Sequence, residues 1–254
     1  MRKKTLIAAA LALAVLVTAA SAYALKLTAG QIIVNAEGGF APTALPKHEN
    51  APITLHGGGS ISTVSGALPP ILKTLTIDFD RHGSVQTTGL PRCSMSKLAA
   101  TTTAQARHAC PAAIVGEGDG KAVVQFPESA PLPVSSPLTL FNGPLKNGDP
   151  TVLAHAYLTV PVPTTYIVLI VIEKIHDGVF GYRTKGTIPP IAGGAGVPVS
   201  GHLTIGRKWS YKGHNYSYVN ARCETGHLQA KGEFEFQGGT FLTGDFLKPC
   251  TVRG

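Results

Sequence analysis

The stretch ILKTLTIDFD, residues 71–80, alternates between apolar and polar side chains. Leu75, Ile77 and Phe79 fall on one face of an extended chain, and threonine and aspartate side chains fall on the other. Side chains of a β-strand point alternately to its two faces, so this pattern predicts a half-buried strand. We therefore expect the two aspartates to face solvent.

The same strand continues into DRHGSV, which resembles part of a calcium loop. Asp78, Asp80, His82 and Gly83 stand at the first, third, fifth and sixth places of that pattern. The twelfth place of an EF-hand loop needs a bidentate carboxylate, and this sequence has Gly89 there. Asp80 to Gly83 is instead typical of a tight turn between two strands. We expect a turn and no metal at this position.

Similar alternating segments recur along the chain, and Gly, Pro, Asn or Asp clusters separate them. The composition agrees, with 29 Gly, 19 Pro and only 14% charged residues. Many short strands at even spacing predict a mainly β protein, built as an antiparallel sandwich or barrel-like domain. Residues 166–172 are apolar without alternation, which predicts a strand covered on both faces. Residues 53–63, ITLHGGGSIST, predict two strands joined by a Gly-rich bend.

The N-terminus predicts a secretory signal peptide over residues 1–24. Three basic residues precede an apolar run, residues 6–17, and A-x-A cleavage patterns end at Ala22 and Ala24. The run is shorter than the about 20 apolar residues of a membrane-spanning helix. We therefore expect the signal peptide to be cleaved and the protein to be exported to the extracellular space or the cell envelope. After cleavage we expect no membrane-spanning segment.

The rest of the chain is predicted as a short leader and one domain. Residues 25–50 show little pattern and are expected to be a poorly ordered leader. Residues 51–254 are expected to form a single β-rich domain. Residues 188–201, IPPIAGGAGVPVSG, form the longest expected loop and could divide two domains. The strand types on its two sides are alike, which favours one.

Four cysteines remain after the predicted signal peptide: Cys93, Cys110, Cys223 and Cys250. An even number in an exported protein predicts disulfides, and sequence proximity favours Cys93–Cys110 and Cys223–Cys250. In the chain-entropy model each such bond stabilises the fold by about 3 kcal/mol. No C-x-x-C pair is present, which argues against zinc.

One helical region is predicted between the first two cysteines, in CSMSKLAATTTAQARHAC. Ser94 or Ser96 can cap a first short turn, and Thr102 or Thr103 can cap a second. A disulfide across this region would hold the helical excursion against the sheet.

Motifs of known chemistry are few. HGGG, residues 56–59, resembles the oxyanion loop of some esterases, but no G-x-S-x-G nucleophile elbow is present. The nine histidines are dispersed. His202, His214 and His227 could converge with a carboxylate such as Glu224 or Glu233 to bind a metal, although scattered histidines are more often solvated. We expect no catalytic residue, metal or cofactor, although an unrecognised Ser-His-Asp or paired-carboxylate site stays open.

The most suggestive surface lies in RKWSYKGHNYSYVNARC, residues 207–223. Alternation places aromatic and cationic side chains on shared faces of two strands. These side chains could stack on sugar rings and hold acidic groups, or they could pair across the hairpin to stabilise it. The expected ligand-binding residues are Trp209, Tyr211, Tyr216, Tyr218 and Arg222.

A series of short segments follows in a fixed order along the chain. The segments are LTIDFDRHGSV, GLPRC, TTTAQARHAC, VGEG, LFNG, VLAHAY and LTIGRKWSYKGHNYSYVNARC. As a series they resemble a family of uncharacterised secreted proteins of actinobacteria, over residues 53–254. The resemblance implies export, one continuous unit and structural cysteines. The family has no established activity, so the resemblance implies no site residue.

Two functions of different classes follow. The first is a non-catalytic secreted protein of the cell envelope or extracellular space that binds a surface polysaccharide, a lipid or another protein. The second is a secreted hydrolase with an unrecognised active site. The formal net charge is +8, and +5 without the three basic residues of the predicted signal peptide. This positive charge could favour a polyanionic cell surface through weak long-range attraction, but spread over the chain it is more typical of an ordinary surface. We expect no nucleic acid partner. The oligomeric state stays open.

Overall fold

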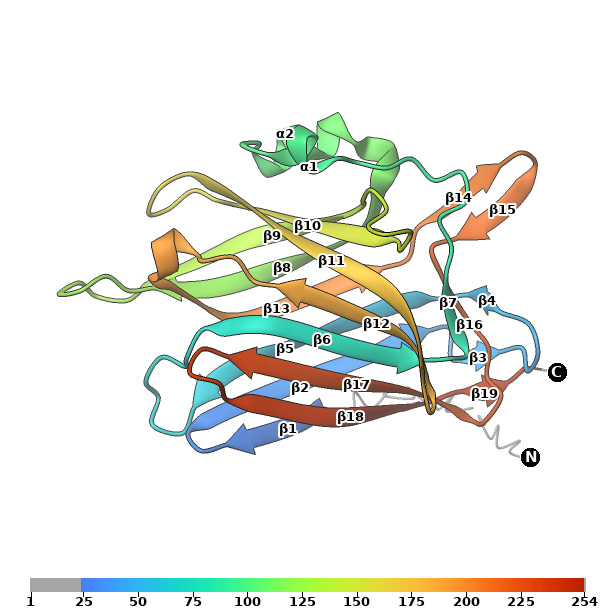
Figure 1. Cartoon of the computed structure of the whole chain (residues 1–254), viewed down its shortest axis with the longest axis horizontal. Coiled ribbons are helices and arrows are strands. Elements are labelled where there is room, and N and C mark those ends of the chain that lie inside the picture. The colour runs from blue at the N-terminus through green and yellow to red at the C-terminus, as the bar shows by residue number, and fades with distance from the viewer. Residues whose placement is uncertain (1–23, 254) are drawn as a thin grey trace, which may run out of the picture.

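The computed structural model describes residues 24–253, so the signal peptide predicted over residues 1–24 lies outside the described residues except for Ala24. The fold is mainly β, as predicted. A single antiparallel sheet of twelve strands curls until it is nearly closed, like a flattened barrel (Figure 1). No helix in residues 24–253 is long and apolar enough to span a membrane. The strands in spatial order are β1 (Ala24–Ala29), β2 (Ile32–Ala41), β5 (Thr54–Thr63), β13 (Gly196–Ile205), β8 (Ile114–Val124), β9 (Leu132–Asn142), β10 (Thr151–Leu158), β11 (Thr164–Asp177), β12 (Phe180–Thr187), β6 (Leu72–Asp80), β17 (His227–Phe236) and β18 (Phe241–Pro249).

The two edge strands, β1 and β18, lie side by side and nearly close the sheet (Figure 1). They are not paired by backbone hydrogen bonds. Side chains form the seam instead, because Leu25 and Leu27 of β1 pack over Gly244 of β18. A side chain at Gly244 would occupy the space of these two leucines.

On β6, alternation separates an apolar inner face from a polar outer face. On β6, Leu75 pairs with Phe234 of β17, and both belong to an inner cluster with Ile32 and Val34 of β2. This cluster joins the two layers of the flattened sheet. The neighbouring residues of β6 point outward, so the predicted half-buried strand is confirmed.

Glycines allow neighbouring strands to approach closely at several positions of the sheet. A Cβ at Gly118 of β8 would overlap the carbonyl oxygen of His202 on β13, and a Cβ at Gly59 of β5 would overlap that of Asn35 on β2. This accounts for the Gly-rich segment at residues 56–59. The predicted bend there is wrong: residues 54–63 form one continuous strand, and its glycines fit close strand packing.

Short strands cover one end of the main sheet. They are β3 (Ala44–Leu45), β4 (Ala51–Pro52), β7 (Gly83–Val85), β16 (Val219–Ala221) and β19 (Thr251–Val252). β16 pairs with β4 and β7, and β19 pairs with β3. A hairpin of β14 (Lys208–Tyr211) and β15 (His214–Ser217) projects from the same end (Figure 1).

Two short helices, α1 (Met95–Leu98) and α2 (Thr103–Ala109), cover the outer face of β9 and β10. A one-turn 3₁₀ helix, η1 (Pro111–Ala113), follows. Thr102 caps α2 with a capping box to Gln105, as predicted. The predicted Cys93–Cys110 and Cys223–Cys250 disulfides are both present. The first of them holds the helices over a small apolar cluster that contains Phe141 and Leu153.

Two expectations about connecting segments are wrong. Residues 25–50 are not a poorly ordered leader; they contain β1, β2 and β3. β2 pairs with β5 and β3 pairs with β19, so the order of this segment depends on strands that are distant in the sequence. The expected loop 188–201 is shorter, since β13 begins at Gly196 after a one-turn 3₁₀ helix, η2 (Ala192–Gly194). One sheet contains strands from both sides of this loop.

Candidate binding site

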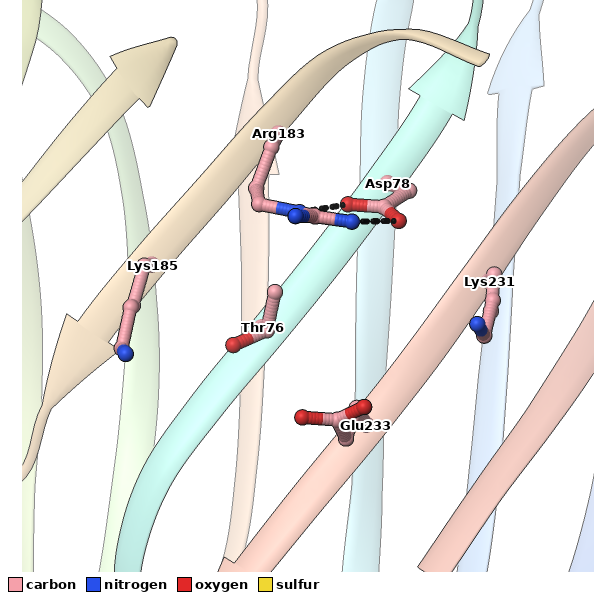
Figure 2. Close-up of a pocket in the computed structure, with 6 residues that line it drawn as sticks. All are labelled: Thr76, Asp78, Arg183, Lys185, Lys231 and Glu233. Atoms are coloured by element: carbon pink, nitrogen blue, oxygen red, sulfur yellow. Dashed lines mark hydrogen bonds and ion pairs between the residues drawn. The ribbon is translucent and has the colours of Figure 1, made fainter. Parts of the chain in front are cut away.

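A polar pocket lies on the outer face of β12, β6 and β17, at the middle of the strands (Figure 2). The strand register places its side chains in two neighbouring rows that run across the three strands. The first row consists of Arg183, Asp78 and Lys231. The second row consists of Lys185, Thr76 and Glu233. The pocket holds about 160 Å³. At about 30 Å³ for each water in the liquid, this is room for a small polar group. We call it the outer pocket, and its lining residues are Thr76, Asp78, Arg183, Lys185, Lys231 and Glu233.

A bidentate ion pair forms the floor of the outer pocket. Arg183 donates from Nε to Asp78 Oδ1 and from Nη2 to Asp78 Oδ2, at 2.7 Å each. Asp78 is only 3% exposed, so the expectation that it faces solvent is wrong. It points outward as predicted, but the guanidinium covers it. The hydrogen bond to Asp78 raises the pKa of Arg183 above its ordinary value.

The other charged side chains of the outer pocket are available to a ligand. Lys185, Lys231 and Glu233 form no ion pair within residues 24–253. Together with the ion pair they give three cations and two carboxylates around one small space. Both oxygens of Asp78 already accept hydrogen bonds, so this carboxylate is poorly placed as a nucleophile or acid. The arrangement can bind acidic or hydroxyl-bearing groups.

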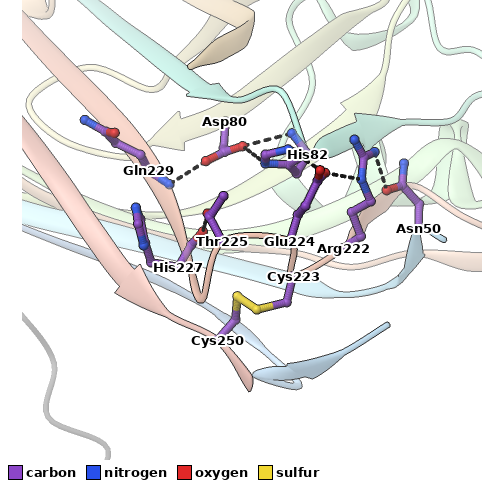
Figure 3. Close-up of polar contacts among 10 residues, drawn as sticks. All are labelled: Asn50, Asp80, His82, Arg222, Cys223, Glu224, Thr225, His227, Gln229 and Cys250. Atoms are coloured by element: carbon purple, nitrogen blue, oxygen red, sulfur yellow. Dashed lines mark hydrogen bonds and ion pairs between the residues drawn. A yellow bond between two sulfur atoms is a disulfide. The ribbon is translucent and has the colours of Figure 1, made fainter. Parts of the chain in front are cut away.

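A second polar network lies where β6 leaves the main sheet (Figure 3). Asp80 Oδ1 accepts from the backbone N–H of His82 at 2.9 Å, and Oδ2 accepts from that of Gln229 at 3.0 Å. Asp80 is buried, so the expectation that it faces solvent is also wrong. The predicted turn is present, but it does not form a hairpin, because the next strand, β7, pairs with β16.

His82 is buried between two carboxylates. Its Nδ1 lies 2.8 Å from Asp80 Oδ1, but the geometry there is not that of a hydrogen bond. Its Nε2 lies 2.9 Å from Glu224 Oε2. Arg222 Nε donates a hydrogen bond to Glu224. This hydrogen bond, together with the nearby His82, lowers the pKa of the Glu224 carboxyl. Because both ring nitrogens face carboxylates, the network ties β6 to the segment that carries Cys223. In residues 24–253 no cluster of three His, Cys, Asp or Glu side chains could hold a metal ion.

The predicted aromatic surface forms only in part. Trp209 and Tyr216 stack with ring centroids 5.7 Å apart, and Trp209 Nε1 donates to the carbonyl of Thr88 at 3.0 Å. The Tyr211 ring lies directly on Gly89, where a Cβ would overlap it, and Lys212 Nζ lies 5.4 Å from the ring centroid. The rings therefore pack on one another, on the 87–90 loop and under a lysine, as expected of a stabilised hairpin.

Tyr218 and Arg222 do not belong to this surface. The chain bends at Tyr218, between β15 and β16, and its ring enters the inner core with 1% exposure. Burial raises the pKa of its hydroxyl well above the ordinary value. Arg222 binds Glu224 and lies 3.5 Å from Asn50 Oδ1 (Figure 3). Alternation fails as a guide here because residues 216–222 are not one strand.

A wider groove lies on the outer face of β8, β9 and β13, beside α2. It contains His202, whose Nε2 is 3.4 Å from Glu37 and whose Nδ1 is 4.0 Å from Asp119. All three side chains are about half exposed. His202 thus meets other carboxylates than those expected from the sequence, in a looser arrangement than the outer pocket.

No protein-family model, curated protein or solved structure matches the chain. The outer pocket was not found from the sequence. Its residues come from three strands, and Asp78 and Arg183 are 105 positions apart. The available signal was the polar face of residues 71–80, which marks one strand of the pocket without its neighbours.

Proposed function

We propose that the protein is an exported, non-catalytic binding protein of the cell envelope or extracellular space, and that its outer pocket binds an acidic surface polysaccharide. The observation that carries this proposal is the Asp78–Arg183 ion pair, which fixes a guanidinium between Lys185 and Lys231. A fixed guanidinium with free N–H groups binds carboxylates in a defined geometry. Glu233 and Thr76 can accept hydrogen bonds from sugar hydroxyls.

Other features support export. Two disulfides are typical of proteins that mature in an oxidising compartment. The N-terminal pattern has the anatomy of a signal peptide, and the ordered series of motifs resembles secreted actinobacterial proteins. The hydrolase remains the second candidate, since Asp78 and Glu233 place two carboxylates in one pocket. Engagement of Asp78 by Arg183 favours binding over hydrolysis.

The proposal is tested by calorimetric titration of the protein beginning at Leu25 with galacturonate oligosaccharides, and with neutral dextran oligosaccharides as the comparison. We expect binding of the acidic chains only. The double substitution Lys185→Gln/Lys231→Gln should weaken it about tenfold, because two partly screened charge contacts contribute about 1.4 kcal/mol together.

The control is Lys208→Gln/Lys212→Gln on the projecting hairpin, which removes the same charge elsewhere and should leave the affinity unchanged. Absence of binding, or equal loss in both variants, contradicts the proposal. Release of shorter oligosaccharides during the titration would favour the hydrolase.

A further inference from the structure

Six loops meet at the end of the main sheet that the short strands do not cover. Strand directions alternate around the sheet, so these connections all lie at one end (Figure 1). We call this the loop end. It comprises the loops β1–β2, β5–β6, β8–β9, β10–β11, β12–β13 and β17–β18, which are residues 30–31, 64–71, 125–131, 159–163, 188–195 and 237–240.

The loop end carries almost no charge. Its six loops contain one charged residue, Glu128, although 14% of the whole chain is charged. The opposite end is different, with Lys47, Arg81 and Glu224 among the charged residues of its connections. Removing the loop end from water therefore requires little dehydration of charge.

Large apolar side chains are exposed at or beside these loops. Val162 of the β10–β11 loop is 66% exposed. Phe126 is 44% exposed and belongs to the β8–β9 loop, which extends furthest at this end (Figure 1). Separate loops supply the others, so the exposed apolar surface surrounds the end of the sheet. The full set is Val64, Phe126, Leu132, Val160, Val162 and Phe241.

The loop backbones are also prepared for an apolar medium. Eight of the 19 prolines lie in these loops, and proline has no N–H to leave unsatisfied. Other N–H groups bond between loops: Val64 N to Gln31 O at 2.9 Å, Gln237 N to Ile71 O at 2.8 Å, and Gln125 N to a carbonyl of the β12–β13 loop. Backbone that enters lipid must satisfy its polar groups internally.

We propose that the loop end docks on a lipid bilayer and inserts its apolar side chains into the interface. Protein–protein interfaces are enriched in Trp, Tyr, Met and Arg, and the six loops contain none of these four residue types. The contact is apolar rather than electrostatic, since the loops hold no lysine or arginine. The outer pocket lies midway along the strands and stays accessible on the docked protein.

Flotation with vesicles of phosphatidylcholine alone tests this docking. The protein beginning at Leu25 should float with the vesicles, and raising the salt from about 0.05 M to about 0.5 M should change the bound fraction by less than twofold, because no charge attraction is involved. Phe126→Asp/Val162→Asp should reduce the bound fraction at least about tenfold, since charges at an apolar interface are costly. Both positions are exposed, and an unchanged melting temperature would show that the variant is folded.

The matched control is Leu145→Asp/Val179→Asp, which charges two exposed apolar residues at the opposite end. It should bind vesicles like the unsubstituted protein. Failure to float, binding that salt abolishes, or equal loss in both variants would overturn the proposal. A dimer that Phe126→Asp/Val162→Asp dissociates, without vesicle binding, would assign this end to self-association. The polysaccharide titration contains no lipid, so the two proposals fail independently.

Discussion

His155 on β10 is a buried histidine whose environment disfavours a second ring proton. Its Nε2 lies 3.1 Å from Thr101 Oγ1 and 3.2 Å from the Thr101 carbonyl oxygen, beneath the α1–α2 connection. Its Nδ1 is buried without a hydrogen-bond partner within the described chain. Protonation would place a charged N–H there with no acceptor. Burial accordingly lowers the pKa of His155 below its ordinary value.

This predicts a loss of stability in acid. The unfolded chain takes up the His155 proton below about pH 6.5, and the folded chain resists it until a lower pH. The contribution is therefore complete above about pH 6.5 and falls below it, by up to about 1.4 kcal/mol for each pH unit. Urea denaturation between pH 7.5 and 5 measures this slope. His155→Leu should flatten it, and an identical slope in both proteins would contradict the assignment.

At the scale of a strand, glycine is required where the backbones of two strands approach each other closely. Two glycines of β8, only one of which lies at such a close approach, allow a test of this requirement. Gly118→Ala on β8 would place a methyl group against the His202 carbonyl and 2.8 Å from Leu203 Cα. We expect a loss of about 1–3 kcal/mol, typical of overpacking. Gly120→Ala, two residues along, meets only Leu138 at ordinary contact distances and should be nearly neutral. Equal effects on the urea midpoint would contradict the role of close approach.

The Cys93–Cys110 disulfide holds an element rather than the whole fold. It closes a 17-residue separation across α1 and α2, which cover Phe141 and Leu153. Cys93→Ser/Cys110→Ser should cost about 3 kcal/mol in the chain-entropy model. Hydrogen exchange should accelerate in residues 93–110 first, while β6 and β17 stay protected. Uniform acceleration across the sheet would show that the disulfide stabilises the fold globally.

Local sequence patterns predicted the elements whose determinants are local. Alternation identified β6, and the pair Thr102 or Thr103 identified the start of α2, which begins after Thr102, because capping depends on residues within one helical turn. Pairing over long distances had no local signal. Asp78 is buried by an arginine from another strand, and strands of residues 25–50 pair with β5 and with β19 near the C-terminus. Tyr218 was misplaced because a bend changed the face that its side chain occupies.

At the scale of the whole molecule, β1 decides whether the sheet closes. Its Leu25 and Leu27 pack over Gly244 of β18, across the seam where backbone pairing is absent. Without β1, the outer edge of β2 would present unpaired N–H and C=O groups, which promote association between chains. The remaining eleven strands would then end in an open, apolar gap.

We therefore expect a protein that begins at Gly30 to be less stable than one that begins at Leu25. Two half-buried leucines and their neighbours contribute roughly 3 kcal/mol, and this lowers the melting temperature by about 10 °C for a chain of this size. Light scattering after size exclusion should show larger species for the shorter protein. Leu25→Ser/Leu27→Ser should reproduce the lower melting temperature, and Lys26→Ser, at an exposed position between them, should not. If all four proteins melt together, the seam contributes nothing, and backbone pairing alone stabilises the sheet.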